Sequence, residues 1–171
     1  MGNVSRIFIA LVLAAVLGSF RHALAAGGSA EAFAQLKSLV GHWEEQKVSE
    51  YKSTLDIELT AGGTALLEKF RMVEQGKPVE MITMYYLDGG QLKLTHYCEA
   101  GNQPTMRGTW APESKTLTFD FENATNLKSP NDGHMHHAVY TFLDAEHFKT
   151  TWTFQKDQKD AFTEDAIYVR K

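Results

Sequence analysis

Glutamate, histidine and cysteine side chains that continue apolar rows of expected β-strands have the greatest capacity for chemistry in this chain. Glu68 lies between Leu66 and Phe70 in one such row, and His96 and Cys98 follow Leu94 in another. Successive side chains of a strand point to opposite faces, so all three polar groups are expected on a buried face. A buried Glu68 would need a partner from another strand, and His96 or His136 would serve. Such a glutamate–histidine pair inside a pocket is capable of general acid–base catalysis, or of orienting the polar end of a ligand.

Each of these residues has a simpler interpretation. Glu68 would point to water if the face parity of its strand were reversed, in which case it needs no partner. Cys98 fits equally well as a small buried hydrophobic residue, because free cysteine is one of the most frequently buried residue types. The chain has neither a Gly-x-Ser-x-Gly nucleophile elbow nor a phosphate-binding glycine loop.

His134 and His136 place two imidazoles on one face of a further expected strand, which is how a β-barrel offers a pair of metal ligands. The carboxylate that would complete a cupin-type site is missing, because residues 139–141 are valine, tyrosine and threonine. A third ligand would have to come from another strand. The two histidines also fit a solvated loop end and a hydrogen-bonded core position, so no metal is predicted.

Short alternating strands must position these side chains. A helix is predicted over residues 29–39 with Ser29 as its N-cap, because Phe33, Leu36 and Val40 lie near helical spacing. About ten strands follow, at residues 43–48, 51–59, 64–72, 79–87, 91–98, 104–110, 116–121, 134–142, 147–154 and 162–170. No segment long enough for a crossover helix separates them, so the sheet is expected to be antiparallel. The regular hairpins favour an all-β fold, a single up-and-down barrel with a short N-terminal helix.

Asp88-Gly89-Gly90 predicts a tight hairpin, because the central residues of such turns need positive φ. The register of this hairpin is open. A two-residue turn at Asp88-Gly89 places Met81, Thr83 and Tyr85 beside the row that contains Leu94 and His96. A three-residue loop ending at Gly90 places the alternate set, residues 82, 84 and 86, there instead.

The first 25 residues are predicted to be a signal peptide. An arginine precedes the apolar run of residues 7–20, and Ala23-Leu24-Ala25 offers a cleavage site. The run is too short to span a membrane, so no membrane insertion is expected after cleavage; an uncleaved anchor is the alternative. The domain is then residues 26–171, and the protein is expected to be exported to the periplasm or secreted.

Charge and cysteine content restrict the partners. Removing 25 of the 171 residues leaves 146, and because the removed segment carries two arginines and no acid, the net charge changes from −4 to −6. An acidic domain whose aromatic residues do not lie among basic runs is not expected to bind nucleic acid. A single cysteine excludes an intramolecular disulfide, so the domain must be stabilised by its core.

Gly41-His42-Trp43 resembles the Gly-x-Trp opening of calycin barrels, which include lipocalins, fatty-acid-binding proteins and nitrobindin-like proteins. In that group a basic residue of the last strand stacks on the tryptophan, and Arg170 stands at the matching place. More closely, the chain is similar to uncharacterised bacterial secreted lipocalin-like proteins, over residues 95–98, 101–104 and 134–137. It departs from nitrobindin-like proteins in having residues 44–46, Glu-Glu-Gln, where they have glycines, and no haem ligand or other cofactor is assigned. The lipocalin disulfide is absent.

The resemblance implies a barrel that binds a small, largely apolar molecule in its interior. The expected apolar wall includes Leu55, Ile57, Phe70, Met84, Leu94, Phe119, Tyr140 and Trp152. The expected ligand-binding residues are Glu68, His96, His136, Cys98, Tyr140 and Trp152. Two alternatives remain: an enzyme that uses an interior glutamate–histidine cluster with or without a metal, and a filled barrel that acts only through its surface. No catalytic residue is assigned.

Overall fold

The structure, a computed structural model, describes residues 28–46 and 52–171. A helix over residues 28–37 precedes ten strands. The strands are β1 (Gly41–Glu45), β2 (Thr54–Thr60), β3 (Ala65–Glu74), β4 (Lys77–Asp88), β5 (Gln91–Tyr97), β6 (Gln103–Ala111), β7 (Thr116–Thr125), β8 (His134–Phe142), β9 (His147–Lys156) and β10 (Lys159–Arg170). The predicted signal peptide lies outside the described residues, as do residues 47–51, which include the end of the first expected strand and the start of the second.

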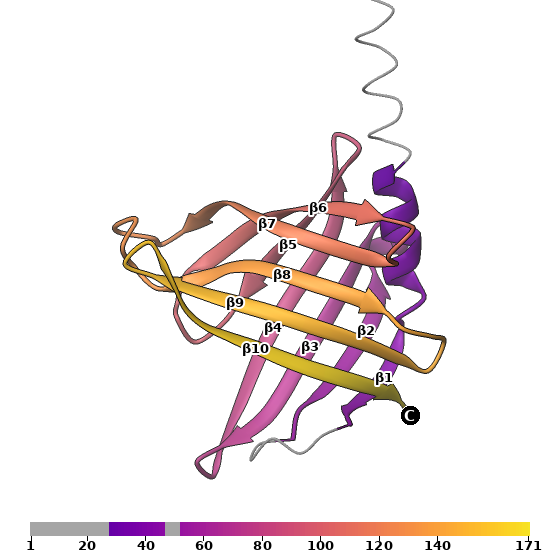
Figure 1. Ribbon diagram of the computed structural model, residues 1–171, viewed down its shortest axis with the longest axis horizontal. Coiled ribbons are helices and arrows are strands. Elements are labelled where there is room, and N and C mark those ends of the chain that lie inside the picture. The colour runs from indigo at the N-terminus through magenta and orange to yellow at the C-terminus, as the bar shows by residue number, and fades with distance from the viewer. Residues whose placement is uncertain (1–27, 47–51) are drawn as a thin grey trace, which may run out of the picture.

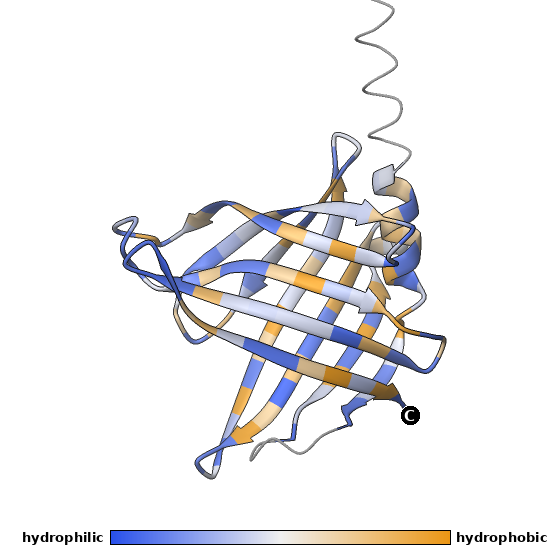
Figure 2. Ribbon diagram, viewed as in Figure 1, coloured by the Kyte–Doolittle hydropathy of each residue, from blue (hydrophilic) through white to orange (hydrophobic). Residues whose placement is uncertain are grey.

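The ten strands form one closed antiparallel barrel in which each strand pairs with its neighbours in sequence and β10 returns to β1 (Figure 1). The predicted fold class is therefore confirmed. The closing contact is short, since β1 pairs with β10 only from Trp43↔Arg170 to Glu45↔Tyr168, near the C-terminal end of the twelve-residue β10. Closure places one face of every strand in the interior, which is why apolar and polar residues alternate along many strands in Figure 2.

The β4–β5 hairpin has the register that puts Thr83 beside His96 and Tyr85 beside Leu94. Its two turn residues are Gly89 and Gly90, both with positive φ, so the turn lies one residue later than Asp88-Gly89. Thr83 and Tyr85 are buried as a result. The prediction that Met84 lines the interior is wrong, because it lies between these two and points to the opposite face.

The Gly-x-Trp segment and the last strand meet as predicted. Trp43 is fully buried, and the guanidinium of Arg170 lies 4.2 Å from the centre of its ring. The same guanidinium donates hydrogen bonds to the carbonyl oxygens of Ser38 and Val40, and the Trp43 indole donates one to Leu39. This contact therefore joins the end of the helix, β1 and β10.

The N-terminal helix covers one end of the barrel (Figure 1). Its apolar face buries Ala32, Phe33 and Leu36 in the same cluster as Trp43, and this cluster continues through the interior to residues such as Leu94, Phe119 and Phe148. Ser29 lies inside the helix and not at its N-cap; its hydroxyl accepts a hydrogen bond from the Gln91 side chain. The helix end of the barrel is thus filled by side chains.

β7 continues to Thr125, four residues beyond the predicted end at Phe121. The added part is polar, but it still pairs with β6, from Gln103↔Thr125 to Thr105↔Asn123. A register shift between Thr105 and Met106 separates this part of the ladder from the rest. Glutamate, asparagine and threonine gave this stretch the composition of a loop.

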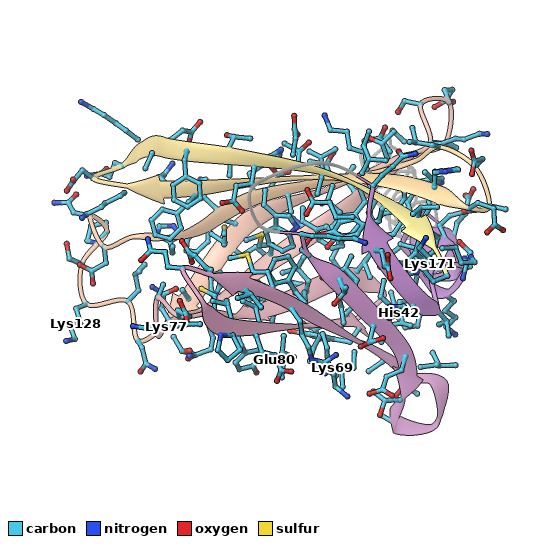
Figure 3. The ribbon with its side chains drawn as sticks, turned by 90° about the horizontal axis from the view of Figure 1, so that it is seen from below. His42, Lys69, Lys77, Glu80, Lys128 and Lys171 are labelled. Atoms are coloured by element: carbon cyan, nitrogen blue, oxygen red, sulfur yellow. The ribbon has the colours of Figure 1, made fainter. Side chains whose placement is uncertain are left out.

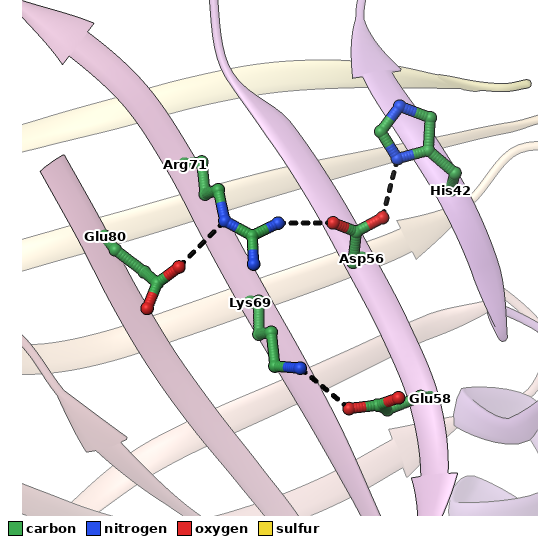
Figure 4. A network of polar contacts seen from close by, with 6 residues as sticks. All are labelled: His42, Asp56, Glu58, Lys69, Arg71 and Glu80. Atoms are coloured by element: carbon green, nitrogen blue, oxygen red, sulfur yellow. Dashed lines mark hydrogen bonds and ion pairs between the residues drawn. The ribbon is translucent and has the colours of Figure 1, made fainter. Parts of the chain in front are cut away.

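Charged side chains cover the outer surface. Lys69 and Glu80 lie on the outside of the strands in Figure 3. Figure 4 shows a chain of polar contacts across β1 to β4, in which Asp56 contacts both His42 (2.7 Å) and Arg71 (2.5 Å), and Arg71 also contacts Glu80 (2.7 Å). These pairs are exposed, so each contributes little to stability. In the part of the chain that the structure describes, no helix is both long and apolar enough to cross a membrane.

Candidate functional site: an acidic cavity in the barrel interior

A cavity of about 370 Å³ occupies part of the barrel interior. The inward-facing rows of β2, β3, β9 and β10 supply most of its wall, with contributions from β1 and β8. Its lining residues are Glu45, Ser53, Leu55, Glu68, Phe70, Met72, Glu74, Tyr140, Thr150, Trp152, Glu164, Asp165, Ala166 and Tyr168. The volume is that of a pocket for one small molecule.

Glu68, on β3, is 4% exposed and ends a chain of hydrogen bonds in the interior. Tyr85 donates its hydroxyl proton to Oε2 of Glu68 over 2.9 Å, and the hydroxyls of Tyr85 and Tyr140 lie 2.6 Å apart. A side-chain hydrogen bond also joins Trp152 to Tyr140. Each hydroxyl has one proton, so Tyr140 shares its proton between the Tyr85 hydroxyl and Oε2 of Glu68, which lies 3.4 Å away.

The chain of tyrosines leaves one oxygen of Glu68 for other contacts. Both hydrogen bonds to Glu68 reach Oε2, and none from the described residues reaches Oε1. Burial raises the pKa of Glu68 to about 7, and the bonds from Tyr85 and Tyr140 oppose this only in part. The partner expected for Glu68 was His96 or His136, and the structure gives two tyrosines instead.

His96, on β5, is 6% exposed and borders a second, smaller cavity of about 50 Å³. Its Nδ1 is hydrogen bonded to the Thr83 hydroxyl at 2.9 Å, and its ring lies against Trp152 with centroids 4.8 Å apart. Its Nε2 is buried and has no hydrogen-bond partner among the described residues. Burial lowers the pKa of His96 to about 4, so the imidazole is neutral at pH 7.

The small cavity adjoins the large one. Glu68, Phe70, Trp152 and Glu164 line both. The structure thus brings together four of the predicted site residues, Glu68, His96, Tyr140 and Trp152, around one interior space.

Carboxylates concentrate where β10 and the end of β3 border the large cavity. Glu164 belongs to an exposed stretch of β10, and Glu74 is the last residue of β3. Partial burial raises the pKa of the Glu164 carboxyl, and the like charges of Glu74 and Glu45 raise it further. Glu45 accepts hydrogen bonds from the backbone and the hydroxyl of Ser53. Three carboxyl groups therefore share this part of the wall.

His136 does not join Glu68 and His96. A register shift between Met135 and His137 makes His136 the extra residue of a β-bulge, and Met135 takes the inward position beside the small cavity. Nδ1 of His136 lies 3.2 Å from Nε2 of His134, and its ring stacks on Phe121. The imidazole pair was predicted, but it lies away from the cavity wall.

Cys98 lies just after β5 and lines neither cavity. Partial burial raises the pKa of its thiol, so it is not an activated nucleophile. No group of three or more histidine, cysteine, aspartate or glutamate side chains in residues 28–46 and 52–171 is arranged to hold a metal ion.

Several cavity residues were not predicted from the sequence. Whether Tyr85 lies inside the barrel depended on the hairpin register, which the sequence left open. Glu45 and Ser53 pair across β1 and β2, and strand alternation from Trp43 and Leu55 places both inside. Alternation from Tyr168 likewise places Glu164 inside. Strand alternation was therefore a usable signal for these acids. It was missed because acidic residues are usually exposed.

The arrangement is suited to binding a molecule that has both an apolar body and a hydrogen-bond donor. Phe70, Trp152 and Tyr168 offer ring surfaces, and Oε1 of Glu68 offers an acceptor. A carboxyl group with a pKa of about 7 is also suited to proton transfer at neutral pH.

No family model matches the chain, and no curated protein matches its sequence. Among solved structures it is similar to Rv2717c from M. tuberculosis, with a TM-score of 0.55 and 15% identity over 82% of this chain and 97% of that one. It also matches a protein of unknown function from the DUF3598 family of Nostoc punctiforme, with a TM-score of 0.48 and 12% identity. That match covers 80% of this chain and 48% of the other. The similarity to Rv2717c shows a shared fold.

Proposed function

We propose that this protein binds a small amphipathic molecule in the cavity of its barrel. The observation that carries the proposal is an interior space of about 370 Å³ that has aromatic walls and one buried carboxyl group, Glu68. The tyrosines bind Oε2 of this group, and its Oε1 accepts no hydrogen bond from the described residues. Binding pockets are typically apolar with a few well-placed polar groups, and this cavity has that composition. The calycin-type arrangement expected from Gly41-His42-Trp43 and Arg170 supports the same function.

A filled-cavity variant tests the proposal. Ala166 is an inward residue of the cavity wall, whereas its neighbour Ile167 points outward and is 38% exposed. Ala166→Trp adds an indole to the cavity, so we expect it to abolish the fluorescence gain of the neutral fluorophore N-phenyl-naphthylamine. Ile167→Trp adds the same group outside the barrel and should leave uptake unchanged.

Thermal unfolding of both variants provides the control for folding. Mass spectrometry of the protein purified from its own source would then show which molecule co-purifies. Equal uptake by the Ala166→Trp variant and the unaltered protein, or absence of uptake in the unaltered protein, would contradict binding in this cavity.

We also propose that the protein acts after export. The basis is the sequence pattern of the first 25 residues, with an apolar run followed by Ala23-Leu24-Ala25. N-terminal sequencing of the exported protein should give a chain that begins near Ala26. A protein that retains Met1 outside the cytoplasm would contradict cleavage.

A further inference from the structure

The region shared by the two cavities has an unusual combination of groups. Glu68 and Phe70 of β3 lie there with Trp152 of β9 and Glu164 of β10, and the last two are paired across neighbouring strands. Two carboxylates and two aromatic rings thus border one space. The negative face of an aromatic ring attracts a cation, and rings combined with acids are how proteins recognise organic ammonium groups.

Among the described residues, no lysine or arginine of the wall balances these acids. The described lining residues of both cavities include no lysine or arginine. Asp165 is already paired with Lys149 at 3.0 Å, but the nearby Glu74 and Glu164 have no such ion pair within the described chain. Burial keeps His96 neutral, so the one imidazole that borders this space does not repel a cation.

His96 supplies a second and independent indication of a ligand. Its side chain is more than nine-tenths buried at the small cavity, and its Nε2 has no hydrogen-bond partner in the described chain. A buried polar atom without a partner is costly, so a bound molecule that reaches Nε2 would remove that cost.

A metal ion does not fit these acids. A metal needs several ligand atoms converging on one point at bonding distance, and the described part of the chain contains no such cluster of three or more metal-ligating side chains. The carboxylates are instead spread along a space large enough for an organic molecule.

We propose that the ligand is an organic ammonium compound, with its charged nitrogen between Glu68 and Glu164 over the ring of Trp152 and its apolar body in the large cavity. This inference rests on the proposed function, since it specifies the chemical class of molecule that the same cavity takes.

Three probes with one indole body and different charge test the inference. Tryptamine is a cation at pH 7, tryptophol is neutral and indoleacetate is an anion. Isothermal titration calorimetry should show tryptamine binding about tenfold or more tighter than tryptophol, with indoleacetate weakest. The ring of Trp152 and two acidic groups favour the cation, and a cation beside Glu68 favours the ionised form of that carboxyl. Glu164→Gln should reduce the preference for tryptamine severalfold, and folding should be unaffected because this side chain is exposed.

Glu80→Gln is the matched control, since it removes the same formal charge from the outer surface, where Glu80 contacts Arg71 (Figure 4). It should leave the preference unchanged. Tryptophol or indoleacetate binding as tightly as tryptamine, or equal effects of the two variants, would overturn the cation inference. Failure of all three indoles while N-phenyl-naphthylamine still enters the cavity would overturn the cation inference alone, and failure of the fluorophore as well would count against the cavity as a binding site.

Discussion

Glu68 and His96 are both buried in the barrel interior, and burial acts on them in opposite directions. It favours the neutral form of each group, so it raises the pKa of the acid and lowers the pKa of the base. The values are about 7 for Glu68, from an ordinary 4.5, and about 4 for His96, from an ordinary 6.5. Both side chains are therefore largely uncharged between pH 4.5 and 6.5.

These pKa shifts have opposite effects on stability. Folded Glu68 binds its proton more tightly than the unfolded chain does, so its contribution to the free energy of unfolding falls as pH rises from about 4.5 to about 7. Folded His96 binds its proton less tightly, so its contribution rises with pH from about 4 to about 6.5. The two contributions oppose one another where these ranges overlap.

Single substitutions should separate the contributions of Glu68 and His96 to the free energy of unfolding. Relative to the unaltered protein, Glu68→Gln should become more stable as pH rises from 4.5 to 7, and His96→Leu should become less stable from pH 4 to 6.5. Each difference has an upper slope of about 1.4 kcal/mol per pH unit, the value for one proton. Denaturant titrations at a series of pH values measure the slopes, and parallel pH curves for all three proteins would refute the assignment.

Sequence reasoning found the inward acid and base but not what they contact. Alternation along a strand depends on nearest neighbours, so the burial of Glu68 and His96 followed from their own segments. Contacts with Tyr85 and Tyr140 depend on the registers of several strands. The displacement of His136 depends on one extra residue at a bulge, which no local pattern revealed.

At the scale of elements, the seam between β1 and β10 depends on one glycine. Gly41 has φ of 142°, and a Cβ atom there would lie 2.8 Å from a guanidinium nitrogen of Arg170. That nitrogen belongs to the group that covers Trp43 and binds the carbonyl oxygen of Val40. A side chain at position 41 would therefore strain the backbone and displace the arginine.

We expect Gly41→Ala to destabilise the protein by about 1–3 kcal/mol, from backbone strain and loss of the cation–π contact. Gly76→Ala is the matched control, because Gly76 also has positive φ but an added Cβ would meet nothing within 4 Å. It should cost about 1 kcal/mol, for strain alone. Equal losses for the two variants in denaturant unfolding would show that Arg170 is not displaced.

The strands themselves were largely predictable because each is bounded by turn residues and alternates within. The boundaries that differ have a physical cause. The turn before β10 consists of Asp157 and Gln158, both with positive φ, so a two-residue hairpin forms without glycine and β10 begins at Lys159, three residues before the predicted start at Phe162. Aspartate and glutamine do not distinguish such a turn from a longer loop.

At the scale of the whole molecule, the acids on the two sides of the barrel wall differ. Outside, Asp56, Glu58 and Glu80 each contact a lysine or an arginine (Figure 4). Inside, the hydrogen bonds that Glu68 accepts from described residues come from tyrosines, and Glu164 faces the like charges of other acids. Within the described residues, these three outer acids thus have basic partners, whereas Glu68 and Glu164 have none.

The two ends of the barrel also differ. The helix and the side chains beneath it fill one end. Toward the other end, β3 and β10 extend past the residues that pair with β2 and β1, and these extensions border the cavity. The strand order and closure were predictable from hairpin spacing. The position of the cavity was not, because it depends on side-chain volumes across the interior.

The contact between Arg170 and the end of the helix has a consequence for the order of folding. Its hydrogen bonds to Val40 and Ser38 join residues separated by 130 and 132 positions. Contacts between such distant residues are slow to form, because a long stretch of chain must first be organised. The hairpins from β2 to β9 can form from local contacts during synthesis, but the barrel cannot close until β10 has been made. Until then the chain remains an open sheet with two free edges, and the cavity does not yet exist.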